Sequence, residues 1–142
     1  MLSDTAMLGL SMRFAVVVDG VDLGGWASCQ GLSVSFGLVE RKEGGVNDRT
    51  MWLPGRVTYP KISLTRAMTS ADSAKVMKWL SSMIDKQQGG TAKITLFDAH
   101  KEEVSSWSLQ NVLPFTWTGP TLNATSREVA IEKLDLVHEG FL

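Results

Sequence analysis

Apolar and polar residues alternate along much of the chain, and this two-residue period is typical of β-strands. Residues 14–18 form a β-branched run, and the Asp19-Gly20 dipeptide that follows is typical of a tight hairpin turn. Residues 31–40 alternate next, and this pattern predicts a half-buried strand with one apolar face, formed by Leu32, Val34, Phe36 and Leu38.

The second half of the chain continues this pattern. Ile62 and Leu64 alternate with polar residues, and residues 91–97 and 103–110 predict a hairpin with its turn over 98–102. Apolar residues continue at odd-numbered positions as far as position 117, which keeps them on one face of an extended strand. Near the end, Val129 and Ile131 fall on one parity and Leu134 and Leu136 on the other. A strand changes faces by inserting a residue, so we expect a β-bulge near Glu132-Lys133.

Residues 69–88 follow a helical period instead. Thr69 and Asp72 resemble a capping box, and Gly89-Gly90 ends the run. The expected apolar stripe consists of Val76, Met77, Leu80, Met83 and Ile84. We interpret the methionines and Trp79 as core residues rather than a ligand site.

Six to eight strands and one helix predict a mainly β fold, an antiparallel β-barrel or sandwich with one flanking helix over about 70–88. The length of 142 residues fits one domain, and no linker, repeat or low-complexity segment divides it. The net charge of -1 argues against a dominant phosphate-binding surface.

Nothing in the sequence predicts an enzyme, a metal site or a cofactor site. Cys29 is the chain's one cysteine, so no intrachain disulfide can form, and we interpret it as a small core residue. His138-Glu139 forms either a proton-transfer pair or a capping or inter-subunit contact. The N-terminus lacks a basic region, and the longest apolar run, 14–18, is far below membrane-helix length. We therefore expect synthesis and assembly in the cytoplasm, without a signal peptide and without insertion into a membrane.

A long loop over about 43–55 places Met51, Trp52 and Leu53 between Gly44-Gly45 and Pro54-Gly55. Loops run over surfaces, and a bare apolar trio on a surface favours aggregation. Either a partner or the chain's own body must cover these side chains.

The chain resembles the tail tube protein family of contractile phage tails and related contractile injection systems over residues 13–141. The resemblance depends on the order and spacing of short motifs: Gly31-Leu32, Glu43-Gly44-Gly45 with Leu53-Pro54-Gly55, Trp107 leading to Pro114, Trp117-x-Gly119-Pro120, and Glu132 with His138-Glu139-Gly140. Ala67 stands where family members often carry glycine. Residues 1–12 match nothing and form an N-terminal extension of a single domain spanning 1–142.

The resemblance implies a structural subunit of an inner tube. Six copies would close into a ring, and rings would stack into a hollow tube that carries DNA or protein cargo inside a sheath. The implied partners are other copies of the chain, the sheath protein, a baseplate or tube initiator, and cargo. The implied location is the inside of a phage tail or injection particle. The expected interface residues are Glu43, Gly44, Gly45, Val46, Asn47, Met51, Trp52, Leu53, Pro54, Gly55, His138 and Glu139.

Two alternatives stay open. One is a tube initiator or another ring protein of the same machine. The other is a small-ligand-binding β-barrel, which needs a pocket with convergent polar groups.

Overall fold

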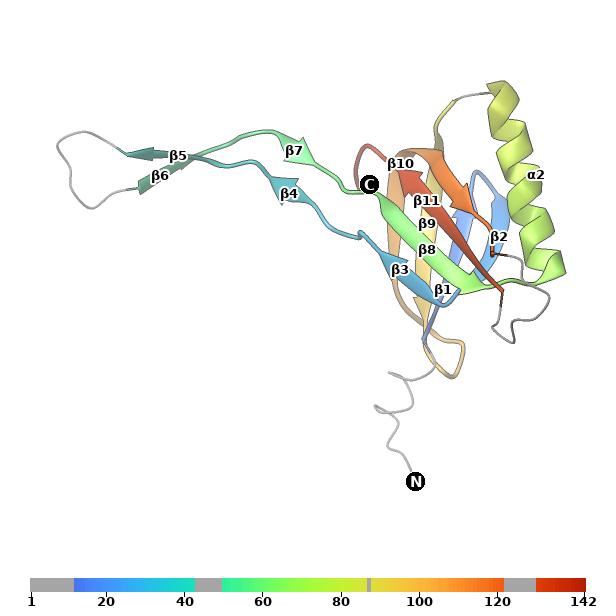
Figure 1. The fold of residues 1–142 in the computed structure, drawn as a ribbon. Helices are drawn as coiled ribbons and strands as arrows, with labels where there is room; N and C mark the ends of the chain where they lie inside the picture. Colours follow the sequence, from blue (N-terminus) through green and yellow to red (C-terminus); the bar gives the residue numbers. More distant parts are fainter. Residues whose placement is uncertain (1–11, 43–49, 87, 122–129) are drawn as a thin grey trace.

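The computed structural model describes residues 12–42, 50–86, 88–121 and 130–142. Figure 1 shows two parts, a body made of a curved sheet with a helix along one side, and a thin arm of paired strands that projects away from the body. This arrangement confirms the mainly β fold with a flanking helix.

The body is built on one antiparallel sheet of seven strands. Its spatial order is β2 (Val21–Trp26), β1 (Arg13–Val18), β9 (Gly90–Phe97), β10 (Glu103–Thr118), β11 (Ile131–Val137), β8 (Ile62–Ala67) and β3 (Ser28–Gln30). β10 is long enough to pair with β9 along its first part and with β11 along its last part. Its register shifts between Leu109 and Val112, where Asn111 has a φ of 51°. The sheet curves so that β2 approaches β8, which gives a sandwich-like body.

Apolar side chains from both halves of the sheet and from the helix fill the body. The buried set is Val16, Val18, Leu23, Trp26, Ile62, Leu64, Val76, Trp79, Met83, Ala92, Ile94, Leu109, Val112, Leu134 and Leu136. Cys29 packs against this core and is partly buried.

Helix α2 (Ser70–Lys86) packs mainly on β2 and also contacts β10. The Thr69 hydroxyl accepts a hydrogen bond from the Asp72 backbone N–H at 3.3 Å, which confirms the predicted cap. The buried side carries Ser73, Val76, Trp79 and Met83. The stripe is therefore rotated from the expected one, and Ile84 is 73% exposed.

The prediction of a half-buried strand over 31–40 is wrong. The chain leaves the body after β3, at Gly31, which has a φ of +96° and approaches the Lys61 carbonyl too closely for any Cβ. Val34, Phe36 and Leu38 are exposed, and β4 (Ser35–Phe36) pairs only with β7 (Val57–Thr58). The alternation is real and Leu32 packs against the core, but no described part of the body covers Val34, Phe36 and Leu38.

The structure also differs from the loop expected over 43–55, in the part of that segment that it describes. Thr50–Leu53 form strand β6, which pairs in register with β5 (Val39–Lys42) from Val39↔Leu53 to Lys42↔Thr50. The predicted interface residues Glu43, Gly44, Gly45, Val46 and Asn47 lie outside the described residues.

The β-bulge expected near Glu132-Lys133 is wrong as well. β11 pairs regularly with β8 from Ile131↔Ala67 to Leu136↔Ile62. Glu132 itself occupies an inward position, with none of its surface exposed, in the same row as Leu134 and Leu136. The parity change in the sequence therefore marks a buried charge and not an inserted residue.

Arg66 neutralises that buried charge. Its Nε donates to the Glu132 carboxylate at 2.6 Å, and its guanidinium lies 3.8 Å from the Trp26 ring centroid. Ser73 and Trp117 donate to the other carboxylate oxygen at 3.0 and 3.1 Å. The four partners come from α2 and three strands, so this ion-pair network ties the helix to the sheet.

Candidate functional site

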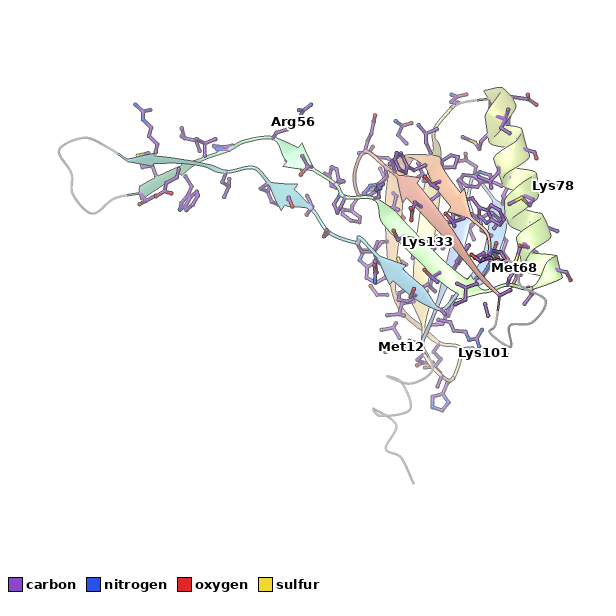
Figure 2. The ribbon with its side chains drawn as sticks, viewed as in Figure 1. Met12, Arg56, Met68, Lys78, Lys101 and Lys133 are labelled. Carbon is purple, nitrogen blue, oxygen red and sulfur yellow. The ribbon has the colours of Figure 1, made fainter. Side chains whose placement is uncertain are left out.

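The arm, defined as residues 34–42 and 50–58, exposes an unusual amount of apolar surface. Figure 2 shows its side chains standing clear of the body, with Arg56 near β7. The exposed apolar residues are Val34, Phe36, Leu38, Val39, Met51, Trp52, Leu53 and Val57. An isolated two-stranded ribbon is only marginally stable in water. The arm is therefore a surface that a partner would stabilise, and it does not fold back onto its own body.

The outer part of the arm has two different faces. Side chains of a strand alternate between faces, and directly paired residues share a face. Val39, Met51 and Leu53 therefore lie on one face. Trp52, which is 59% exposed, lies on the opposite face beside its paired residue Glu40. The sequence trio is thus divided between two faces of a ribbon.

Pro54 and Gly55 connect β6 to β7 and are exposed. A Cβ at Gly55 would overlap the Gly37 carbonyl on the other strand. Gly37 donates its backbone N–H to the Arg56 carbonyl at 2.8 Å. The two strands of the arm can approach this closely only because Gly55 has no side chain.

An aromatic cluster lies at the root of the arm. Tyr59, His138 and Phe141 form three mutual ring contacts with centroids 5.2 to 5.8 Å apart. His138 is buried, and its Nδ1 accepts the Gly140 backbone N–H at 3.1 Å, so the proton of the neutral ring lies on Nε2. Burial lowers the pKa of His138 from its ordinary value of 6.5.

The structure brings the arm and the His138 region together only at this root. Glu139 is exposed, and its backbone N–H donates to the Gln110 carbonyl at 2.9 Å. The position of His138 in an aromatic cluster is that of a packing residue, and the Glu139 hydrogen bond to β10 fixes the backbone beside it.

A second apolar surface lies on the body and was missed by sequence reasoning. It is a shallow groove of about 310 Å³ between the C-terminal half of α2 and the last part of β10, lined mainly by Leu80, Met83, Ile84, Pro114, Phe115 and Trp117. Ile84 was expected in the buried stripe. Its exposure follows from the rotation of α2 on the sheet, which the helical period alone does not determine.

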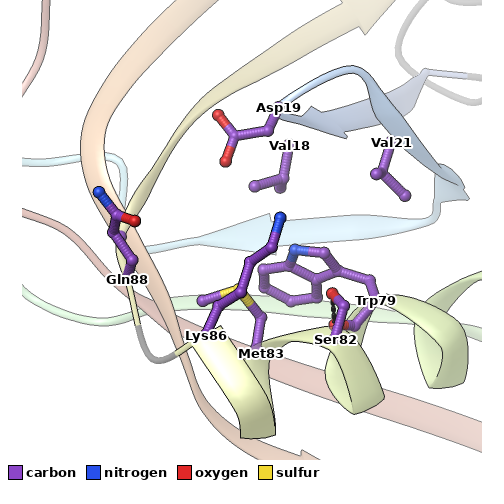
Figure 3. Close-up of a pocket in the computed structure, with 9 residues that line it drawn as sticks. Val18, Asp19, Val21, Trp79, Ser82, Met83, Lys86 and Gln88 are labelled. Carbon is purple, nitrogen blue, oxygen red and sulfur yellow. Dashed lines mark hydrogen bonds between the residues drawn. The ribbon is translucent and has the colours of Figure 1, made fainter.

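A larger cavity of about 380 Å³ lies between the β1–β2 turn and the end of α2 (Figure 3). Its ionisable lining residues are Asp19 and Lys86. The Asp19 carboxylate already accepts the Thr91 backbone N–H at 2.9 Å, and the Ser82 hydroxyl donates to the Trp79 carbonyl at 2.6 Å. Asp19 and Ser82 therefore hold the turn and the helix, and Lys86 is the other charged side chain of the cavity lining.

Within residues 12–42, 50–86, 88–121 and 130–142, no group of three or more His, Cys, Asp or Glu side chains could hold a metal ion. No helix in those ranges has the length and apolar content that crossing a bilayer would need.

Solved structures share this fold. The chain superposes on a chain of an extracellular contractile injection system, the PVC sheath-tube complex in the extended state, with a TM-score of 0.74 and 23% identity, covering 92% of this chain and 86% of that chain. A chain of the anti-feeding prophage baseplate gives a TM-score of 0.73 at 23% identity, with coverage of 92% and 90%. Hcp1 from Salmonella typhimurium gives 0.58 at 8% identity, with coverage of 90% and 82%.

No curated protein sequence matches the chain. The model of one protein family, described as T4-like virus tail tube protein gp19, matches residues 10–142, which is nearly the whole chain. The resemblance inferred from short motifs is thereby confirmed, and the chain belongs to the T4-like virus tail tube protein family.

Proposed function

We propose that the chain is the repeating subunit of the inner tube of a contractile tail or injection system, in which rings of six copies stack into a hollow conduit. The observation that carries this proposal is the family match over residues 10–142. In this role the chain is a structural protein without enzymatic activity. Its partners are other copies of itself, a surrounding sheath, a baseplate or tube initiator, and DNA or protein cargo in the bore.

The arm is the element through which one copy holds another. Seven of its apolar side chains, from Phe36 to Val57, are each between about a third and two thirds exposed. Full burial of one such side chain contributes about 1.5 to 3 kcal/mol. Covering the exposed halves of these side chains therefore contributes at most about 5 to 10 kcal/mol for each arm.

Ordering the arm opposes this gain. Fixing a residue's backbone costs about 1 to 2 kcal/mol, so a fully flexible arm would lose more than burial returns. Pairing of β5 with β6 orders part of the arm before contact and reduces that cost. A ring that presents several docking sites at once reduces it further through high effective concentration. Growth from a preformed ring or initiator is therefore favoured over association of free copies.

The predicted interface residues Met51, Trp52, Leu53, Pro54 and Gly55 lie on this arm, which supports their assignment. His138 and Glu139 act at the root, where the aromatic cluster and the Gln110 hydrogen bond set the direction in which the arm leaves the body. Their proposed contribution to assembly is to orient the arm.

The test is the substitution Trp52→Ala, with Val104→Ala as the matched control, an exposed apolar residue on the body. Trp52→Ala should leave the free energy of unfolding of the unassembled chain within about 0.5 kcal/mol of the unsubstituted value. It should also abolish long tubes in electron micrographs, whereas Val104→Ala should still form them. Normal tubes from Trp52→Ala, or unfolding of its monomer, would contradict the proposed role of the arm.

A further inference from the structure

The groove on the body is lined by apolar side chains, several of them exposed. Its rim residues Ile84 and Phe115 are 73% and 56% exposed, among the most exposed large apolar residues of the described chain. Leu80 and Trp117 form a partly buried floor that packs against the core. Exposed apolar residues gathered around one hollow are typical of an interaction site.

The arm of the same copy points away from the groove, although its root lies near the rim, where Lys61 contacts Phe115. Figure 1 shows α2 along one side and the arm projecting from the ends of β3 and β8, away from the helix. An arm that occupies the groove therefore comes from a second copy. A patch on one copy that binds a different patch on the next is a heterologous contact, and such contacts build rings or open stacks.

The two surfaces each carry a charged residue of opposite sign beside the apolar side chains, Glu40 on the arm and Lys61 at the groove, although Lys42 falls on the same face of the arm as Glu40. Glu40 is paired directly with Trp52 and shares its face of the arm. At the groove, the Lys61 ammonium lies over the Phe115 ring, 4.4 Å from its centroid. An indole placed against Phe115 would bring the carboxylate beside it towards Lys61. The opposite face of the arm, with Val39, Met51 and Leu53, has Arg41 in the same alternation and offers no such carboxylate.

We propose that Trp52 of one copy docks in the groove between Ile84 and Phe115 of a second copy, with Glu40 facing Lys61. This assignment rests on the proposed function, since it takes the arm as the element that joins copies, and it names the surface that receives it. Large aromatic side chains in a pocket with a charged partner at the rim are typical binding hot spots. The other face of the arm stays free to contact a different surface of the assembly.

The direct test is a crosslinking map. Benzoylphenylalanine replaces Trp52 in the full chain, tubes are assembled with an excess of unsubstituted copies and irradiated, and the crosslinked peptides are identified by mass spectrometry. The expected products join position 52 to peptides that contain Leu80, Ile84 or Phe115. Crosslinks confined to other parts of the chain would overturn the assignment of the groove.

Substitutions supply an independent measurement, the protein concentration needed for polymerisation. Ile84→Asp should raise it at least tenfold, whereas Met77→Asp, on the same helix but outside the groove, should change it less than threefold. Glu40→Lys and Lys61→Glu should each raise it, and the double substitution should return it to within about threefold of the original value.

The outcomes separate the two proposals. If Trp52→Ala stops polymerisation but Ile84→Asp does not, the arm still joins copies and the groove is not its receptor. If neither substitution affects polymerisation, the role of the arm in assembly is itself wrong. Circular dichroism of each variant confirms that the body is folded, and the crosslinking map does not depend on any substitution in the groove.

Discussion

Replacing Glu132 by Gln should destabilise the body strongly, although it changes one oxygen to an NH₂ group. Glu132 is fully buried, and its carboxylate accepts hydrogen bonds from Arg66, Ser73 and Trp117. Arg66 is only 4% exposed and donates further to the carbonyls of Leu23 and other residues. These neutral acceptors hold the guanidinium in place but leave its charge uncompensated once Glu132 is neutral.

Removing one partner of a buried ion pair typically costs 3 to 5 kcal/mol, because the remaining charge stays in a region of low dielectric constant. A protein of this size has a total stability of about 5 to 15 kcal/mol. The expected loss for Glu132→Gln is therefore about 3 to 5 kcal/mol. It corresponds to a decrease in Tm of about 10 to 20 °C.

The free energy of unfolding of the unassembled chain is measured by urea denaturation, with circular dichroism as the signal. The matched control is Lys75→Ala, which removes the exposed Lys75–Asp72 pair, 3.8 Å apart, on the same helix. That control should cost less than about 1 kcal/mol. A loss below about 1 kcal/mol for Glu132→Gln, with an unchanged dependence on urea, would refute the view that this pair fastens α2 to the sheet.

Three further predictions concern single side chains. Folding lowers the pKa of His138 below 6.5, so the unfolded chain binds more protons than the folded chain. The free energy of unfolding should therefore fall as the pH drops from about 7 to 5. This dependence on pH should be weaker in His138→Phe, and an equal dependence would contradict the prediction. Burial raises the pKa of the Cys29 thiol to about 11, so at pH 8 its reaction with Ellman's reagent should be at least tenfold slower in the folded chain than in urea, and equal rates would show that the thiol is not buried. Gly55→Ala should block tube growth seen by electron microscopy, because its Cβ would overlap the Gly37 carbonyl, while the unfolding free energy of the body changes by less than about 0.5 kcal/mol; unimpaired tubes would show that the arm tolerates wider spacing.

The sequence predicts most elements of the body because their signals are local. The β9–β10 hairpin follows from alternation on both sides of a turn, and the start of α2 follows from the Thr69 cap. The same reasoning is incomplete for the arm. Alternation shows that Phe36 and Leu38 are apolar positions in an extended segment, but it does not show whether the covering surface belongs to the same copy.

The remaining errors have tertiary causes. A glutamate inside a strand is indistinguishable by period from an outward residue, and only its contact with Arg66, 66 residues away along the chain, explains its burial. The groove likewise forms between Ile84 of α2 and Phe115 of β10, two elements whose relative rotation depends on the packing of the whole core. An assembly site made from two such elements cannot be predicted from the residue pattern of either segment alone.

The strand order has a consequence for how the chain is made. β1 lies between β2 and β9, and the Asp19 carboxylate in the turn of the β1–β2 hairpin accepts a hydrogen bond from the Thr91 N–H, 72 residues later. At about 5 to 20 residues per second, a ribosome needs about 4 to 14 s to deliver β9 after that hairpin emerges. Throughout this interval one edge of β1 has no partner strand, and the apolar arm emerges before β9 is available. Chaperone cover during translation thus matters more to this chain than its small size suggests.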